Sequence, residues 1–174
     1  EVYRLAASAF GTREPNRIRV KKSIGVQVVG MTSCPCAMEG VRELMSAEKP
    51  DCASALRSIP VITHNQRNVT TLRMDVPDGS EVEADVLIDI VERSLSSPTR
   101  EILKRRDEAE LVYAAHLNPK FVEDVVRSVL EQVVEKFASL PGEVEVAVMS
   151  LSKESIHKHD AMAERVTTLA ELRS

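Results

Sequence analysis

Three short stretches of the sequence carry most of the side chains that could bind a metal or move a proton. Cys34 and Cys36 flank a single proline in GMTSCPCAMEG, and they are two of only three cysteines. His64 follows in THNQRN, and His157 and His159 stand close together in ESIHKHDA. Thiolate and imidazole are ligands that zinc and ferrous iron accept in proteins. The residue types therefore permit one metal site of the Cys–His kind.

Spacing alone leaves the Cys-Pro-Cys stretch open to three interpretations. A redox pair, a metal clip and two buried thiols that close a strand are all compatible with it. The metal clip is not favoured by the spacing, because C-x-C is shorter than the usual C-x-x-C clip. Pro35 also restricts the local backbone, so that a single cysteine could ligate without the other. An odd number of cysteines argues against a disulfide framework and for a reducing, cytosolic setting. Cys52 is expected to be an ordinary thiol.

The histidines have structural alternatives as well. His64 could be a packed or capping residue, although a buried run as polar as Asn65 to Asn68 would need many hydrogen-bond partners. In an extended segment His157 and His159 would project from one face, either as functional groups or as solvent-facing residues. His116 has no comparable context and is expected to be structural or exposed.

Two acidic pairs lie in helical stretches, Asp107-Glu108 and Glu123-Asp124. Most such pairs are simply solvated. Glu123, however, is expected in the first turn of its helix, where the dipole favours a charged carboxylate. A carboxylate fixed there could accept hydrogen bonds from the N–H edge of a ligand.

Composition excludes several classes of protein. The net charge of −4 and only five aromatic residues argue against nucleic-acid binding. No apolar run approaches membrane length and no secretory signal is visible, which favours a cytoplasmic protein without a membrane partner. The P-loop, G-x-S-x-G, G-x-G-x-x-G and H-E-x-x-H patterns are all absent from the sequence.

The elements that must position these residues follow from periodicity and breakers. Strands are expected over 18–30, 67–76, 143–151 and in 160–172, and helices over 37–46, 83–97, 99–116 and 118–140. Residues 47–58 are expected to be a loop, Ser97-Pro98 to start a helix, and Asn118-Pro119 to cap and start the next. This order of strands and helices predicts an α+β fold, with an antiparallel sheet and helices layered on one face.

Five motifs in one order carry a resemblance: SCPCAMEG, ITHNQRN, LKRRDEAELV, NPKFVEDVVR and ESIHKHDA. Together they resemble the type IB GTP cyclohydrolase family, and its archaeal branch more than its bacterial one. The resemblance covers roughly Gly30 to Arg165. It implies a tunnelling fold (T-fold) in which 1–58 ends the first half and 59–174 forms the second. It also implies a homotetramer with active sites at subunit interfaces, and a further N-terminal portion.

The resemblance also assigns roles to residues. Cys34, His64, Glu108 and His157 would hold the metal, while Cys36 would only shape the turn. His157, His159 and Glu108 would be catalytic. Glu123 would anchor guanine, and the triphosphate would meet some of the basic residues Arg67, Lys104, Arg105, Arg127, Lys153 and Lys158, with Arg67 foremost.

The implied reaction opens the imidazole ring of GTP and releases formate, with one divalent metal per site, Fe(II) foremost and Mn(II) or Zn(II) as alternatives. The archaeal product would be 7,8-dihydroneopterin 2′,3′-cyclic phosphate for tetrahydromethanopterin-type pterins, and the bacterial alternative is 7,8-dihydroneopterin triphosphate for folate. Two other readings stay open. One is a T-fold nitrile reductase with a cysteine nucleophile and a nicotinamide cofactor. The other is a non-catalytic, metal-stabilised assembly protein.

Overall fold

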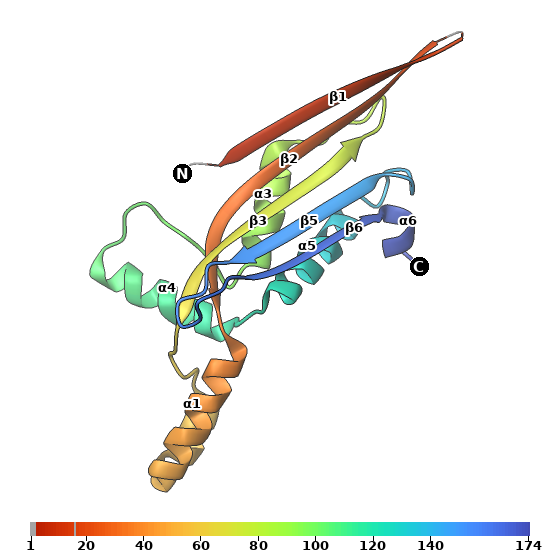
Figure 1. Cartoon of the computed structure of the whole chain (residues 1–174). Coiled ribbons are helices and arrows are strands. Elements are labelled where there is room, and N and C mark those ends of the chain that lie inside the picture. The colour runs from red at the N-terminus through yellow and green to blue at the C-terminus, as the bar shows by residue number, and fades with distance from the viewer. Residues whose placement is uncertain (1–2, 16) are drawn as a thin grey trace.

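The computed structural model describes residues 3–15 and 17–174 (Figure 1). Within these residues, six strands form one antiparallel sheet in the order β1-β2-β3-β5-β6, with the short β4 paired to β2. The strands are β1 Arg4–Glu14, β2 Arg17–Ser33, β3 Asn65–Val76, β4 Ser97–Pro98, β5 Glu145–Ser152 and β6 Ala161–Thr168. The helices are α1 Pro35–Glu48, the 3₁₀ turn η1 Pro50–Cys52, α2 Ala53–Ser58, α3 Ala84–Ser94, α4 Arg105–Leu117, α5 Val122–Lys136 and α6 Leu169–Leu172.

The hydrophobic core lies between the sheet and helices α3 and α5, which cover the same face (Figure 1). Alternate residues of the central strands point into it, as the period of a strand requires. The two helices add a stripe at helical spacing. The fully buried side chains of the core include Val26, Val28, Leu72, Met74, Leu87, Val91, Val125, Val129, Val133 and Val146. The predicted α+β fold with helices on one side of an antiparallel sheet is therefore confirmed.

The strand register brings several chain segments to one end of the sheet. Ser33 pairs with Asn65 where β2 ends and β3 begins, and Ser152 pairs with Ala161 where β5 ends and β6 begins. Helix α1 leaves from this end and projects away from the sheet (Figure 1). The short segments that follow or precede these strands therefore lie near one another.

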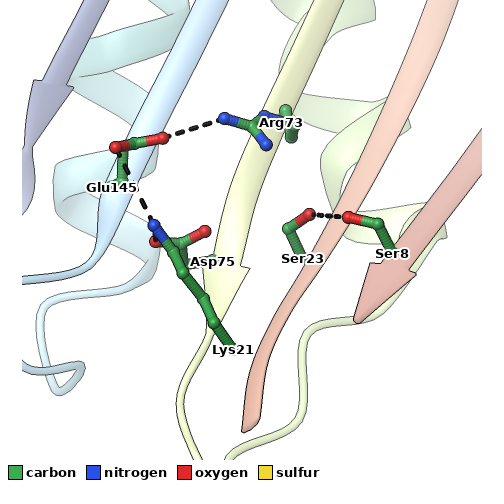
Figure 2. Close-up of polar contacts among 6 residues, drawn as sticks. All are labelled: Ser8, Lys21, Ser23, Arg73, Asp75 and Glu145. Carbon is green, nitrogen blue, oxygen red and sulfur yellow. Dashed lines mark hydrogen bonds and ion pairs between the residues drawn. The ribbon is translucent and has the colours of Figure 1, made fainter. Parts of the chain in front are cut away.

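Charged side chains link three strands at the opposite end (Figure 2). Lys21 of β2 lies 3.0 Å from the carboxylate of Asp75 and 3.9 Å from that of Glu145. Arg73 donates to the other oxygen of Glu145 at 2.8 Å. The hydrogen bond and charge of Asp75 raise the pKa of Lys21, whose side chain is 58% exposed whereas that of Asp75 is 12% exposed. Ion pairs with an exposed partner orient the strands more than they stabilise them.

Gly30 allows the segment after α3 to lie against β2. A Cβ built at this position would fall 2.3 Å from Leu95 Cδ1 and 3.1 Å from the carbonyl oxygen of Ser97. Gly30 also pairs with Pro98 in the β2–β4 ladder. The absence of a side chain here lets β4 join the sheet and lets Leu95 remain buried.

The structure corrects three sequence predictions. Residues 47–58 are not a loop, because Pro50 begins η1, which runs into α2, a proline being well tolerated in a first turn. Ser97-Pro98 does not start a helix; it forms β4, whose position is set by its ladder with β2. The strand β1 and the short α6 were not anticipated.

The third correction concerns the start of α5. Asn118 and Pro119 do not cap it, because Phe121 is its N-cap and the carboxylate of Asp124 accepts from the Phe121 N–H at 3.0 Å. Asn118 instead ends α4, and its side chain donates to the carbonyl oxygen of Leu95 at 3.1 Å. This tertiary bond outweighs the local capping preference. Helix α4 itself is unbroken at Asp107.

No helix among the described residues is long and apolar enough to cross a membrane. The boundary predicted at 58 lies between α2 and β3, and the division into two T-fold halves stays a prediction, as does the T-fold itself.

Candidate functional site

Cys34 and His64 lie at the same end of the sheet, just beyond the last pair of the β2–β3 register. That pair is Ser33 with Asn65, so each candidate ligand is the next residue beyond the end of the antiparallel register. Cys34 has extended backbone angles and is the N-cap of α1. Pro35 occupies the first helical position, which suits its fixed φ. The proline therefore marks the change from strand to helix and leaves the half-buried Cys34 at the junction.

The imidazole of His64 has one engaged and one free nitrogen. Its Nδ1 lies 3.1 Å from Ser155 Oγ, while its Nε2 is buried and has no hydrogen-bond partner among the described residues. With the proton on Nδ1, the serine accepts it and Nε2 presents a lone pair. Metal-binding histidines commonly have this arrangement, in which the second nitrogen is held by a hydrogen bond. The residue thus fits a ligand role.

A cavity of about 160 Å³ opens beside Cys34. It is lined by Cys34, Gln66, Lys120, Phe121, Val122, Glu123, Ser152, Glu154 and Ala161. Glu123 lies in the first turn of α5, as predicted. The fold therefore brings the predicted metal ligand Cys34 and the predicted guanine anchor Glu123 to the same cavity, although they belong to distant parts of the sequence.

Gln66 is a further candidate in this cavity that the sequence did not single out. Its Nε2 donates to Glu154 Oε1 at 3.1 Å, and its Oε1 is buried without a hydrogen-bond partner among the described residues. A buried amide oxygen that lacks a partner is costly and is normally satisfied. Because Gln66 is only 7% exposed and lines the cavity, its oxygen is available to a donor on a bound ligand.

Lys120 also lines the cavity and joins it to the core. Its Nζ donates to the carbonyl oxygen of Ser94 at 2.8 Å and lies 3.4 Å from Ser128 Oγ. Burial lowers the pKa of Lys120, partly opposed by the charges of Asp124 and Glu131. The ammonium therefore sits between the ends of α3 and α5 and fixes the segment that leads into Glu123.

His157 and His159 lie in the exposed segment between β5 and β6. Their rings stack with centroids 5.3 Å apart. The base of the segment is closed by Lys153 and Asp160, whose Nζ and Oδ2 are 2.5 Å apart, and this hydrogen bond lowers the pKa of Asp160. Ser155 of the same segment contacts His64. The segment therefore lies next to one candidate ligand, but neither histidine lines the cavity.

Two predicted site residues lie elsewhere. Glu108 is exposed in the first turn of α4 and lines a separate groove with Ile62 and Tyr113. Arg67 lines a third cavity with Glu92 and Thr99, because consecutive residues of β3 face opposite sides of the sheet. Among residues 3–15 and 17–174, no group of three or more His, Cys, Asp or Glu side chains is close enough to hold a metal. Cys34 and His64 remain candidate donors, of which Cys34 lines the cavity and His64 does not.

The other basic residues predicted as phosphate ligands do not line this cavity either, so none of the residues predicted to meet a triphosphate is among its lining residues. His116 is buried at 1% exposure, in agreement with its expected structural role.

Comparison with known proteins identifies relatives over the whole chain. The family model for type I GTP cyclohydrolase folE2 matches residues 1–163. Proteins called GTP cyclohydrolase MptA are similar to it: that of Methanococcus aeolicus is 43% identical over 182 residues, covering 100% of this chain and 59% of the relative. Those of Methanobrevibacter smithii and Methanocaldococcus jannaschii are 42% and 41% identical, each covering 99% of this chain and 58% of the relative.

The chain therefore spans about three fifths of the length of the curated relatives that it matches. These relatives are archaeal proteins, which confirms the expected branch.

Proposed function

The chain belongs to the type I GTP cyclohydrolase folE2 family, and on this premise we propose that its protein is a GTP cyclohydrolase of the archaeal, methanopterin-forming branch. The observation that carries the proposal is the single cavity shared by Cys34 and Glu123. Two residues expected to serve metal and guanine, from two distant motifs, line one space of a size suited to a small polar group. The match to a cyclohydrolase family also favours this function over a nitrile reductase.

Cys34 and His64 would hold the metal. The support is the chemistry of the donor set and the buried, unpaired Nε2 of His64. When bound, a divalent metal, Fe(II) foremost and Mn(II) or Zn(II) as alternatives, would lower the pKa of the water that attacks C8 of guanine. Glu108 and His157 remain proposed further donors. Because both are exposed, the proposal includes a homotetramer with active sites at subunit interfaces, in which exposed groups can meet the cavity.

Glu123 would bind guanine and select it against adenine. A carboxylate accepts two hydrogen bonds from the N1–H and the 2-amino group of guanine, and an adenine edge would leave it unpaired. The free Oε1 of Gln66 adds a second acceptor in the same cavity. Two acceptors in one cavity suit the N–H edge of a purine.

His157 and His159 would move protons as N7 is released and formate leaves. Their segment is held at its base by Lys153 and Asp160 and touches His64 through Ser155. Imidazole nitrogens can both donate and accept protons, and the exposed position of this pair leaves them in contact with water. Arg67 and other exposed cations would bind the triphosphate.

The product branch follows from the relatives. Their archaeal origin supports 7,8-dihydroneopterin 2′,3′-cyclic phosphate for methanopterin synthesis, with 7,8-dihydroneopterin triphosphate for folate as the alternative. The test is anaerobic incubation of the full chain with Fe(II) and GTP, followed by formate measurement and the mass of the pterin. Stoichiometric formate and the cyclic phosphate are expected. Activity without any metal would refute the metal-dependent mechanism, and no formate with any of the three metals would refute the activity.

A further inference from the structure

Two residues that precede the candidate ligands are anchored to adjacent positions of one helix. Ser33, just before Cys34, donates its hydroxyl to the carbonyl oxygen of Ala115 at 2.6 Å. The N–H of Thr63, just before His64, donates to His116 Nε2 at 3.2 Å. Ala115 and His116 are consecutive residues in the last turn of α4. The Cys34 and His64 segments therefore share one point of attachment.

The histidine is held so that it can accept this bond. His116 Nδ1 lies 2.8 Å from the carbonyl oxygen of Val112 on its own helix. Nε2 lies 3.2 Å from both the N–H and the carbonyl oxygen of Thr63. A carbonyl oxygen only accepts, so with the proton on Nδ1 alone Nε2 accepts from the Thr63 N–H, and with a proton on Nε2 as well it donates to the Thr63 carbonyl oxygen; in both cases the ring holds the Thr63 backbone. With 1% exposure, the ring has no room to exchange these partners for water.

Ser33 is held from three sides. Besides the bond to Ala115, its N–H donates to Ser96 Oγ at 3.3 Å, and its carbonyl oxygen accepts from the N–H of Lys120 at 3.1 Å. The residue is fully buried. Since Lys120 leads into the first turn of α5, the same residue also relates Cys34 to the segment that carries Glu123.

These hydrogen bonds to α4 lie beyond the end of the β2–β3 ladder, where the sheet supplies no backbone hydrogen bonds between the two segments. The β2–β3 ladder ends at the pair of Ser33 with Asn65, and residues 59–64 have no regular structure. Helix α4 packs against the end of β2 at this place (Figure 1). A bond from each segment to the same turn of α4 replaces the missing ladder bonds.

We propose that His116 and Ser33 are positioning residues that hold Cys34 and His64 at a fixed separation for metal binding. This inference rests on the proposed function, because it presumes that these two residues are ligands. Neither positioning residue touches the metal; each acts through the backbone next to a ligand. Residues that orient ligands typically change metal affinity by about 10- to 100-fold when replaced.

The test compares two substitutions of one residue. The Oε1 of His116→Gln can take the place of Nε2 and accept from Thr63, whereas His116→Asn reaches only the helix carbonyl that Nδ1 contacts. Co(II) serves as the probe in the full chain, because a cysteine thiolate ligand gives it a charge-transfer band. We expect about a tenfold loss of Co(II) affinity in His116→Asn, recovery in His116→Gln, and a similar loss in Ser33→Ala.

Two controls separate this role from simple stability. Thr167→Val removes the hydrogen bond of another buried side chain, from Thr167 Oγ1 to the exposed Glu171 at 2.6 Å, at the opposite end of the sheet, and should leave Co(II) affinity unchanged. Amide exchange at Thr63, measured without metal, should accelerate in His116→Asn but not in His116→Gln.

The failure of each proposal gives a different result. Unchanged Co(II) affinity in Cys34→Ala would overturn the proposed metal function itself. A loss in Cys34→Ala together with unchanged affinity in His116→Asn would overturn the positioning role alone. Equal losses of Co(II) affinity in His116→Asn, His116→Gln and Thr167→Val would also overturn it, because the losses would then result from lower stability and not from the missing hydrogen bond to Thr63.

Discussion

Cys34 and His64 each lie one residue beyond Ser33 and Asn65, the last register pair of β2 and β3. Neither residue belongs to the ladder, but its end brings their two segments to the same end of the sheet. Their relation depends on the antiparallel pairing of two strands that are joined by α1, η1 and α2. The position of the candidate metal site thus depends on the end of the β2–β3 ladder, and α1, which follows β2, projects away from the sheet at this end.

Replacing Cys34 with Ala is expected to abolish metal binding and formate release while the fold persists. The side chain is half-buried at a helix junction and makes no capping hydrogen bond to the described residues of α1, so its removal should cost little stability. Metal content by mass spectrometry and circular dichroism measure the two effects. Cys52→Ala, at an exposed thiol, is the matched control and should behave as wild type. Unfolding of Cys34→Ala would instead identify a structural thiol.

Replacing Glu123 with Gln is expected to weaken GTP binding by about 10- to 100-fold, because hydrogen bonds to a charged group contribute about 1.5–3 kcal/mol. Metal binding should be retained, since Glu123 is not a proposed ligand. Isothermal titration with GTP and metal analysis separate these outcomes. Glu131→Gln removes an exposed carboxylate from the same helix and provides the control. Wild-type GTP affinity in the Glu123 variant would remove its role as guanine anchor.

The segment that carries His157 and His159 should loosen in acid. The hydrogen bond from Lys153 lowers the folded-state pKa of Asp160 below its unfolded value. The contribution of the pair is therefore present above the unfolded pKa and is lost as pH falls through the folded one. NMR titration should place the Asp160 pKa below 3.8, and Lys153→Ala should move it back toward that value. An unshifted carboxyl in the wild type would contradict the closed base of the segment.

Truncating the core should cost far more than truncating the surface. Leu87 on α3 is fully buried, so Leu87→Ala is expected to lower the free energy of unfolding by about 2–5 kcal/mol. Leu44 on α1 is 65% exposed, and Leu44→Ala should change it by no more than about 0.5 kcal/mol. Urea denaturation checks both. Similar losses at the two positions would mean that the projecting helix is packed in solution.

Periodicity in the sequence was sufficient for the core and most elements. The stripe from Val122 to Val133 predicted α5, and the alternation over 143–151 predicted β5, because one buried face imposes each period. Helix starts were less predictable. Asn118 has the chemistry of a cap, but its side chain is used by the Leu95 carbonyl, a tertiary contact that no local pattern contains.

The site was predictable in its residue types more than in its assembly. Motif order indicated Cys34, His64 and Glu123, and the fold brings Cys34 and Glu123 to one cavity. Gln66 was missed because its candidate role depends on burial, and His116 was expected to be structural or exposed without a link to the site. The strand period of β3 does place Gln66 on the same face as the buried Asn68, a signal that could have marked it.

Gly30 makes two positions of the chain interdependent. Its missing side chain is volume that Leu95 occupies, so any larger residue at 30 would displace Leu95 and, with it, the strand that carries the chain toward α4. The effects of substitutions at 30 and 95 should then fail to add, a smaller residue at 95 offsetting part of the damage from a larger one at 30. The residues allowed at positions 30 and 95 therefore depend on each other. The path of the chain from α3 through β4 to α4 requires that the side chain at position 30 be no larger than a hydrogen atom.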